Sequence, residues 1–492
     1  MAMLTLKEKT IRGGAARVVA QAAGLALRIG GVVVLARLLS PKDFGLVSMV
    51  TAFTGVLTWF RDFGLSAVVV QRPNITTDQH STLFWINVLL GALLTLITLA
   101  AAPAISAFYH EPRLLWVAAV LGTTFLFNAA GIQHSALLQR EMRFGDLSAI
   151  SVLSLLLGTA IAIVGAAIGY GYWALVAAAV ATPIAASAGY WLVTGWIPGI
   201  PRWGALPRSM FHFGSTLTVN NVVAYIALNS DKLMIGHYFG ANAIGIYTRA
   251  FQVLSIPTDN LNSAVGEVAF SALSRLQNDR ARLKSYFLKG FSLVLGLTLP
   301  VTVVCALFAD DVVLVVLGPK WHAATQIVRL LAPTTAVLAI INPLTWLICS
   351  LGLVRRSLRI TLVHSPILIL GCLLGLHWGM TGVAFAYSAV MVLWVIPHTA
   401  WCVHGTGISF GDIGMAAIRP LVWCAIAGAA GYAVRRACGG FDSPLLRLVL
   451  ETGVLAVTFY AGLVFAGGQK ALYLDLLRAV GSGRRVQEAA EI

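Results

Sequence analysis

The chain has 492 residues, of which 58% are hydrophobic and only 11% charged, and its mean hydropathy is +0.84. A soluble protein of this length carries about a quarter charged residues, so the composition excludes an ordinary soluble enzyme or binding protein. The net charge of +15 arises mainly from loops on one side of the predicted membrane, and it does not indicate nucleic-acid binding.

Apolar segments long enough to cross a bilayer recur along the chain, since a hydrocarbon core about 30 Å thick takes roughly 20 apolar residues per helix. They lie at 15–38, 44–70, 79–102, 114–138, 146–169, 172–196, 213–239, 243–270, 285–307, 324–350, 357–376, 380–404, 412–434 and 445–467. The alternation typical of a barrel is absent. The sequence therefore predicts an all-α polytopic membrane protein with about 14 transmembrane helices.

One turn occurs twice: residues 35–46 align without gaps on residues 235–246. In both copies an apolar helix ends, a short polar turn follows, and an apolar residue plus Gly opens a second helix. A parallel repeat of this kind predicts a transporter with its site between the two halves. The alternative is that tight Gly turns recur wherever membrane helices are joined. The predicted divisions are 1–14 (cytoplasmic), 15–212 (N-lobe), 213–407 (C-lobe), 408–467 (two additional helices) and 468–492 (cytoplasmic tail).

Basic residues predict the orientation, because cytoplasmic loops of membrane proteins are enriched in Lys and Arg. If the N-terminus is cytoplasmic, most of the 34 Lys and Arg fall on the cytoplasmic side, including the run from Arg275 to Lys289. Both termini are therefore expected inside. Arg435 and Arg436 disagree with this rule, so the last two spans are placed least firmly.

Six basic residues fall within predicted spans, where an ionisable group is costly and by default marks a cavity or a partner. They are Arg28, Arg61, Lys232, Arg249, Arg329 and Arg419. Helical geometry places polar side chains on one face of each of four spans. These faces hold Gln21 with Arg28; Thr51 with Thr58 and Asp62; Asn221 with Tyr225 and Lys232; and Arg249 with Gln252, Asn260 and Glu267.

The four spans with polar faces are the corresponding helix pairs of the two repeats, which favours one hydrated cleft with surplus positive charge. The alternative is helix–helix contact, such as an Arg61–Glu267 or Arg28–Asp62 pair. Other candidate sites are weak: Asp310 and Asp311 are expected in a solvated outer turn. No metal-ligand spacing and no nucleotide-binding motif occurs, so no cofactor and no direct ATP coupling are expected.

Several runs in this order resemble the Wzx-type polysaccharide flippases, with the exporters of colanic acid and related exopolysaccharides most similar. These runs are 34–49, 62–67, 71–74, 138–144, 229–236 and 245–250. The resemblance implies membership of the multidrug/oligosaccharidyl-lipid/polysaccharide superfamily. Its fold is two six-helix lobes in a V, often with two extra C-terminal helices.

The resemblance also implies a function: moving undecaprenyl-pyrophosphate-linked oligosaccharide across a bacterial inner membrane, within membrane lipid, for exopolysaccharide, capsule or O-antigen synthesis. A polysaccharide polymerase and chain-length machinery are the implied protein partners. Related flippases of the MurJ type hold the pyrophosphate with arginines in helices one, two and eight, where Arg28, Arg61 and Arg249 lie here. Lys232, Gln21, Gln252, Asn221 and Asn260 complete the expected substrate-binding set.

Four acidic residues are candidates for ion coupling: Asp231, Asp259, Glu267 and Asp43. Carboxylates in a low-dielectric cleft can exchange protons as the lobes alternate. The alternative, which pairing of intramembrane charges favours, is that Asp231 beside Lys232 and Glu267 near Arg249 are plain ion pairs. Two other functions stay open. One is a membrane enzyme of polysaccharide assembly (a polymerase, ligase or acyltransferase); the other is an ion-coupled multidrug extruder, for which an acidic cavity is expected.

Overall fold

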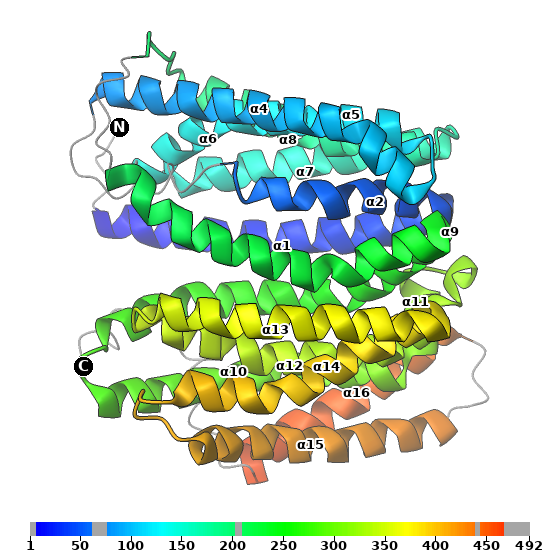
Figure 1. The fold of residues 1–492 in the computed structure, drawn as a ribbon. Helices are drawn as coiled ribbons and strands as arrows, with labels where there is room; N and C mark the ends of the chain where they lie inside the picture. Colours follow the sequence, from blue (N-terminus) through cyan, green and yellow to red (C-terminus); the bar gives the residue numbers. More distant parts are fainter. Residues whose placement is uncertain (1–5, 62–75, 202–208, 438–442, 467–492) are drawn as a thin grey trace. The chain divides into compact units, whose positions relative to one another are not determined.

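The computed structural model describes residues 6–61, 76–201, 209–437 and 443–466 (Figure 1). Throughout these ranges the secondary structure is helical, without strands. Contacts divide the chain into two compact units, 1–248 and 249–492, with the boundary inside one long helix.

The first unit is formed by helices that pack as close neighbours: α4 packs antiparallel to α6 and α7 antiparallel to α8, whereas α7 lies parallel to α1. Its elements are α1 (Leu6–Leu38), α2 (Pro41–Thr58), α4 (Thr77–Tyr109), α5 (Leu114–Gly122), α6 (Thr124–Arg140), α7 (Phe144–Ala167), α8 (Tyr172–Thr194) and the first part of α9 (Ser209–Arg275).

The second unit contains the remainder of α9 and the helices that follow it, in which α12 contacts both α10 and α14, and α15 pairs with α16. Its elements are α10 (Arg280–Leu307), α11 (Ala309–Val316), η2 (Pro319–Trp321), α12 (Ala324–Ser350), α13 (Val354–Gly375), η3 (Leu376–Trp378), α14 (Gly379–Val403), α15 (Phe410–Ala437), α16 (Pro444–Ala461) and the π-helical turn η4 (Gly462–Ala466).

The predicted all-α, polytopic fold is confirmed: each predicted span coincides with a helix or part of one in the described residues. Ten stretches of the described chain are long and apolar enough to cross a membrane, with α13 and α14 counted together as Val354–Val403. Helices α2 and α9 are not among these ten. They are two of the helices to which the sequence assigned polar faces.

Two local features account for how these helices begin and pack. Ser40 and Thr76 open α2 and α4 with capping boxes, in which the hydroxyl accepts from a backbone N–H three residues later and the side chain there accepts in return. Small residues let helices approach closely, as membrane helices generally do: a Cβ added to Gly91 would lie 2.5 Å from the Cβ of Ala129. Large apolar side chains such as Leu192, which is 84% exposed, cover the outer surface, as expected in lipid.

The compact units do not share the boundary predicted for the lobes, which was placed at 212/213. Residues up to Thr248 belong to the first unit because the first part of α9 packs on α2. The division into an N-lobe, a C-lobe and two additional helices therefore stays a prediction.

Candidate functional site

The two copies of the repeated turn lie against each other within the first unit. A Cβ added to Gly45 on α2 would lie 1.7 Å from the carbonyl oxygen of Ala241. A Cβ added to Gly245 on α9 would lie 1.8 Å from the carbonyl oxygen of Pro41. In the gapless alignment Gly45 corresponds to Gly245, and Pro41 to Ala241, so the contact is reciprocal. Each glycine is required because its neighbour's backbone occupies the space of a side chain.

One turn further along, equivalent residues meet directly. The hydroxyl of Ser48 lies 3.1 Å from the hydroxyl of Thr248, and these residues are again counterparts in the two copies. A residue contacts its own counterpart only where it lies near a local twofold axis. The sequence repeat therefore has a spatial meaning: the two copies form a locally symmetric contact between α2 and α9.

The turn itself is built differently in the two copies. In the first, Ser40 caps α2 and Asp43 accepts hydrogen bonds from the backbone N–H and hydroxyl of Ser40, at 2.9 and 2.6 Å. The other carboxylate oxygen of Asp43 accepts from the backbone N–H of Tyr172, at 3.1 Å. In the second copy Gly240, the counterpart of Ser40, breaks α9 with a positive φ of 77°. Asp43 thus holds the starts of α2 and α8 together.

Upstream of the break, the polar face of α9 is used partly for packing. The Tyr225 hydroxyl donates to the carbonyl oxygen of Thr51 at 3.2 Å, and Gly55 leaves room for this ring. Tyr225 therefore joins α9 to α2. This is the helix–helix contact that the sequence analysis gave as the alternative to a hydrated cleft. The side chain of Asn221 lies outside the described part of the structure.

Asp231 and Lys232 point to different partners although they are adjacent. Asp231 is fully buried and accepts a 2.7 Å hydrogen bond from the Tyr247 hydroxyl, across the Gly240 break. Lys232 is half-buried and donates to the side-chain oxygen of Asn229 at 2.7 Å. The second carboxylate oxygen of Asp231 has no hydrogen-bond partner in the described residues. Asp231 is thus a buried acid that uses one carboxylate oxygen for the hydrogen bond with Tyr247, while the other accepts none within the described residues.

In the second unit Arg249 is half-buried, and its guanidinium donates to the side-chain oxygen of Gln252 one turn later. Asn260 donates to the carbonyl oxygen of Ile256 at 2.6 Å, and Asp259 is exposed. Arg249, Gln252 and Asn260 belong to the predicted polar face of this helix, whereas Asp259 does not. The backbone of Glu267 belongs to α9, but its side chain lies outside the described part.

The two other arginines of the predicted pyrophosphate site, Arg28 and Arg61, differ in their surroundings. Arg28 and Gln21 are both exposed on α1, and side chains added at the neighbouring Gly24 and Gly30 would meet nothing within 4 Å. Arg61 was predicted to lie within a transmembrane helix. It lies instead in the turn that follows α2, because α2 ends at Thr58. Asp62, its predicted neighbour, lies outside the described residues.

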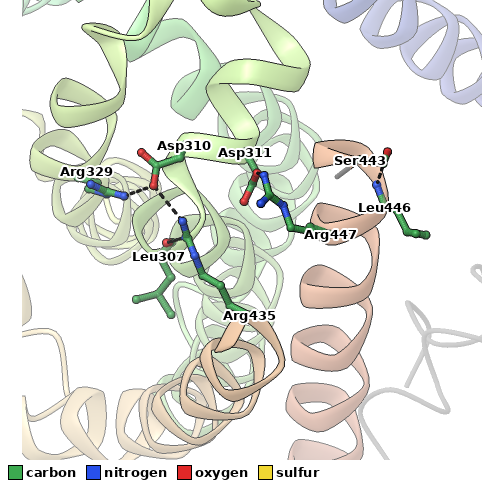
Figure 2. A network of polar contacts seen from close by, with 8 residues as sticks. All are labelled: Leu307, Asp310, Asp311, Arg329, Arg435, Ser443, Leu446 and Arg447. Carbon is green, nitrogen blue, oxygen red and sulfur yellow. Dashed lines mark hydrogen bonds and ion pairs between the residues drawn. The ribbon is translucent and has the colours of Figure 1, made fainter. Parts of the chain in front are cut away.

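The expectation that Asp310 and Asp311 are solvated is wrong for Asp311 only, since the Asp310 side chain is 40% exposed. Asp311 is buried and forms an ion pair with Arg447 on α16, in which the carboxylate oxygen lies 2.7 Å from the guanidinium nitrogen. Asp310 pairs with Arg329 on α12 and, at 3.0 Å, with Arg435 on α15 (Figure 2). Arg435 also donates to the carbonyl oxygen of Leu307 at 2.7 Å. On the predicted topology Arg435 is an exception to the charge rule, and its pairing with Asp310 offers a local reason for that exception.

Sequence reasoning missed the contact of Ser48 with Thr248 and the buried Glu451 on α16. The first could have been found by extending the repeat alignment two residues and asking which counterparts meet on an axis. The second had a weaker signal, an acid inside an apolar span four residues after an arginine.

Comparison with known proteins defines the family. A family model described as polysaccharide biosynthesis protein matches residues 34–326, more than half of the chain. The chain belongs to this family. It is 28% identical to the teichuronic acid biosynthesis protein TuaB of Bacillus subtilis over 57% of this chain, and it spans 59% of the length of TuaB. It is 26% identical to the lipopolysaccharide biosynthesis protein WzxC of Escherichia coli, over 69% of this chain and 70% of WzxC.

Solved structures agree on the fold of this family member. The lipid II flippase MurJ in an inward closed conformation superposes with a TM-score of 0.67, covering 92% of this chain and all of MurJ at 13% identity. An inward-facing multidrug transporter of the MATE family gives a TM-score of 0.64 over 78% of this chain and 94% of its own, at 14% identity. This family member therefore shares the helical fold of these two structures, which is the fold that the sequence resemblance implied.

Proposed function

We propose that this protein is a flippase that moves undecaprenyl-pyrophosphate-linked oligosaccharide repeat units across a bacterial inner membrane by alternating access. The observation that carries the proposal is Arg249, a permanently charged side chain placed midway along an apolar protein of the polysaccharide biosynthesis family and oriented by Gln252. Relatives named for polysaccharide biosynthesis, and a structural neighbour named as a lipid II flippase, support the same substrate class.

The chemistry of the substrate explains why arginine is needed. A pyrophosphate is a dense anion that cannot cross hydrocarbon, and arginine offers phosphate oxygens a planar, permanently charged fork. Because Gln252 occupies one edge of the Arg249 guanidinium, it fixes the direction in which the fork points. Arg28 is proposed as a second pyrophosphate ligand, since it is exposed on an apolar helix beside two glycines with open space. Arg61 is proposed as a third, from the turn after α2.

The other polar side chains of the predicted set would bind the sugars. Gln21, Asn221, Asn260 and Lys232 are proposed to supply hydrogen bonds to hydroxyl groups, while the polyprenyl tail stays in lipid. The reciprocal glycine contact of α2 with α9 is proposed to be the closure at the outer end, and it would separate when substrate is released outward. Both termini are proposed to be cytoplasmic, and a polymerase with its chain-length machinery would consume the product.

Asp231 is the acid best suited to ion coupling, because it is fully buried and, within the described part of the chain, only one of its oxygens accepts a side-chain hydrogen bond, from Tyr247. Proton binding at the other oxygen would be sensitive to any movement of the Gly240 break, which Tyr247 spans. Asp259 and Glu267 are proposed as weaker candidates. Asp43 is committed to capping α2 and joining it to α8, so its contribution would be structural.

The proposed function is tested by reconstituting the protein in vesicles with a lipid-linked glycan and measuring which leaflet the glycan occupies. Wild-type protein should move it, and Arg249→Ala should not, while Arg249→Lys should retain part of the rate because the charge remains without the planar fork. Arg282→Ala is the matched control, since the Arg282 side chain is 67% exposed and should leave the rate unchanged. Equal rates for wild type and Arg249→Ala would refute this role.

The same vesicles distinguish the other candidate functions. A polymerase, ligase or acyltransferase would lengthen or modify the glycan without moving it. A multidrug extruder would move cationic drugs and ignore the anionic lipid. Crossing of an unmodified glycan is the outcome that the basic residues predict.

A further inference from the structure

The C-terminal helix α16 carries a carboxylic acid in an unusual setting. Glu451 is 0% exposed, and neither of its carboxylate oxygens has a hydrogen-bond partner among the described residues. Burying an ionised carboxylate without hydrogen bonds is very costly, so a group in this position takes up a proton instead. The geometry therefore shows Glu451 in the setting of a neutral acid.

An unused donor lies one helical turn away. Arg447 holds Asp311 on α11 through its terminal nitrogen at 2.7 Å, but its Nε–H is buried and has no hydrogen-bond partner in the described chain. Residues four apart on a helix are neighbours, so Arg447 and Glu451 lie on the same side of α16. One arginine thus has two acids within reach and is bonded to only one of them.

The remaining charged groups around Glu451 are already paired. From α11 it faces Asp311, and from α15 it faces Arg435, which is bonded to Asp310 and to the carbonyl oxygen of Leu307 at the end of α10. Arg329 on α12 holds Asp310 from the other side (Figure 2). Arg447 is therefore the group best able to change partner when the charge of Glu451 changes.

We propose that Glu451 is a proton-binding site that controls whether α16 is tied to α11. With the proton bound, Glu451 is neutral and Arg447 bridges to Asp311, as in this structure. When the proton leaves to solvent, the Glu451 carboxylate attracts Arg447 through its free Nε–H, and the bridge to Asp311 weakens. On the predicted topology this cluster faces the outer side of the membrane, so the site would respond to external pH.

The sign of the effect follows from linkage. The bridged arrangement binds the proton more tightly, so lowering the pH favours it and raising the pH favours the released one. For each pH unit by which the proton affinity differs between the two arrangements, their equilibrium shifts about tenfold. Amide hydrogen exchange in α11, corrected for its intrinsic pH dependence, should therefore rise about tenfold between roughly pH 5 and pH 8.

The experiment compares purified full-length wild-type protein, Glu451→Gln and the control Glu141→Gln in detergent. Glu451→Gln mimics the protonated acid and should keep α11 protected at both pH values. Glu141→Gln should leave the wild-type pH response intact, because the Glu141 side chain is 53% exposed. A pH response equal in wild type and Glu451→Gln, or no response in wild type, would overturn the proposal.

A second measurement needs no variant at the site. Dicyclohexylcarbodiimide adds to protonated carboxylic acids in apolar surroundings, so wild-type Glu451 should be labelled near the lower pH and increasingly protected near the higher one. Mass spectrometry of the α16 peptide reads the modification directly. Absence of labelling at the lower pH, or labelling that does not fall as the pH rises, would refute proton binding at Glu451.

Discussion

The reciprocal glycine contact makes a sharp prediction, because two single methyl groups should each disturb it. In Gly45→Ala the new Cβ would stand 1.7 Å from the carbonyl oxygen of Ala241, and in Gly245→Ala it would stand 1.8 Å from that of Pro41. Both obstacles are backbone atoms, which no side-chain rotation can move. The helices must separate by about 1.7 Å to reach the 3.4 Å at which ordinary contact begins.

The magnitude can be isolated with a matched control. Replacing an internal helical glycine by alanine stabilises the helix by about 1 kcal/mol, which would partly mask the clash. Gly30→Ala on α1 carries the same gain, but its Cβ would meet nothing within 4 Å. The difference in free energy of unfolding between Gly30→Ala and either contact variant therefore reports overpacking alone, for which about 1–3 kcal/mol is typical. We expect Gly45→Ala and Gly245→Ala to be less stable than Gly30→Ala by this amount.

Thermal unfolding of the purified variants in one detergent measures the ranking, and leaflet assays on the same preparations measure transport. Because the contact is locally symmetric, Gly45→Ala and Gly245→Ala should show defects of similar size. If either variant unfolds at the same temperature as Gly30→Ala, the helices can separate without cost and the close-contact reasoning is wrong.

Four further outcomes are expected. Ser48→Cys combined with Thr248→Cys should form a disulfide on oxidation, because the two hydroxyls are 3.1 Å apart, and should arrest transport until reduced; transport by the oxidised protein would contradict outer closure there. Arg447→Ala should cost about 3 kcal/mol, because it leaves buried Asp311 without its partner, whereas the exposed Arg282→Ala should stay within about 0.5 kcal/mol in the same unfolding assay. Reporter tags at the N-terminus, near Arg280 and after Arg485 should all be cytoplasmic, and an external signal near Arg280 would overturn the topology. Asp231→Asn should abolish any response of transport to an imposed pH gradient; an unchanged response would assign Asp231 a structural role.

Most of the fold could be predicted from the sequence because hydrophobic length and turn chemistry are local properties. The helix break predicted near 240 occurs at Gly240, and the turn at Ser40 and Pro41 opens α2. The end of α2 at Thr58 could not be predicted, because the apolar composition continues beyond it.

The site was predicted less completely, because helical periodicity gives the face of a side chain but not its partner. It placed Arg249 and Gln252 together correctly, since they are neighbours on one helix. It could not tell that Asp231 bonds Tyr247 rather than Lys232, or that Asp311 is buried by Arg447 from a helix more than a hundred residues away. Such pairings depend on tertiary packing, on which local periodicity carries no information.

The meeting of Ser48 with Thr248 has a consequence for how this sequence can change over time. At most positions the two copies of a duplicated segment diverge independently, since each has its own surroundings. At the axis each residue is the surroundings of its own counterpart, as in a homodimer fused into one polypeptide. A substitution at Ser48 or Gly45 therefore alters the selective pressure on the other copy. We expect these paired positions to drift together while the flanking turn, where Gly240 stands in place of Ser40, drifts apart.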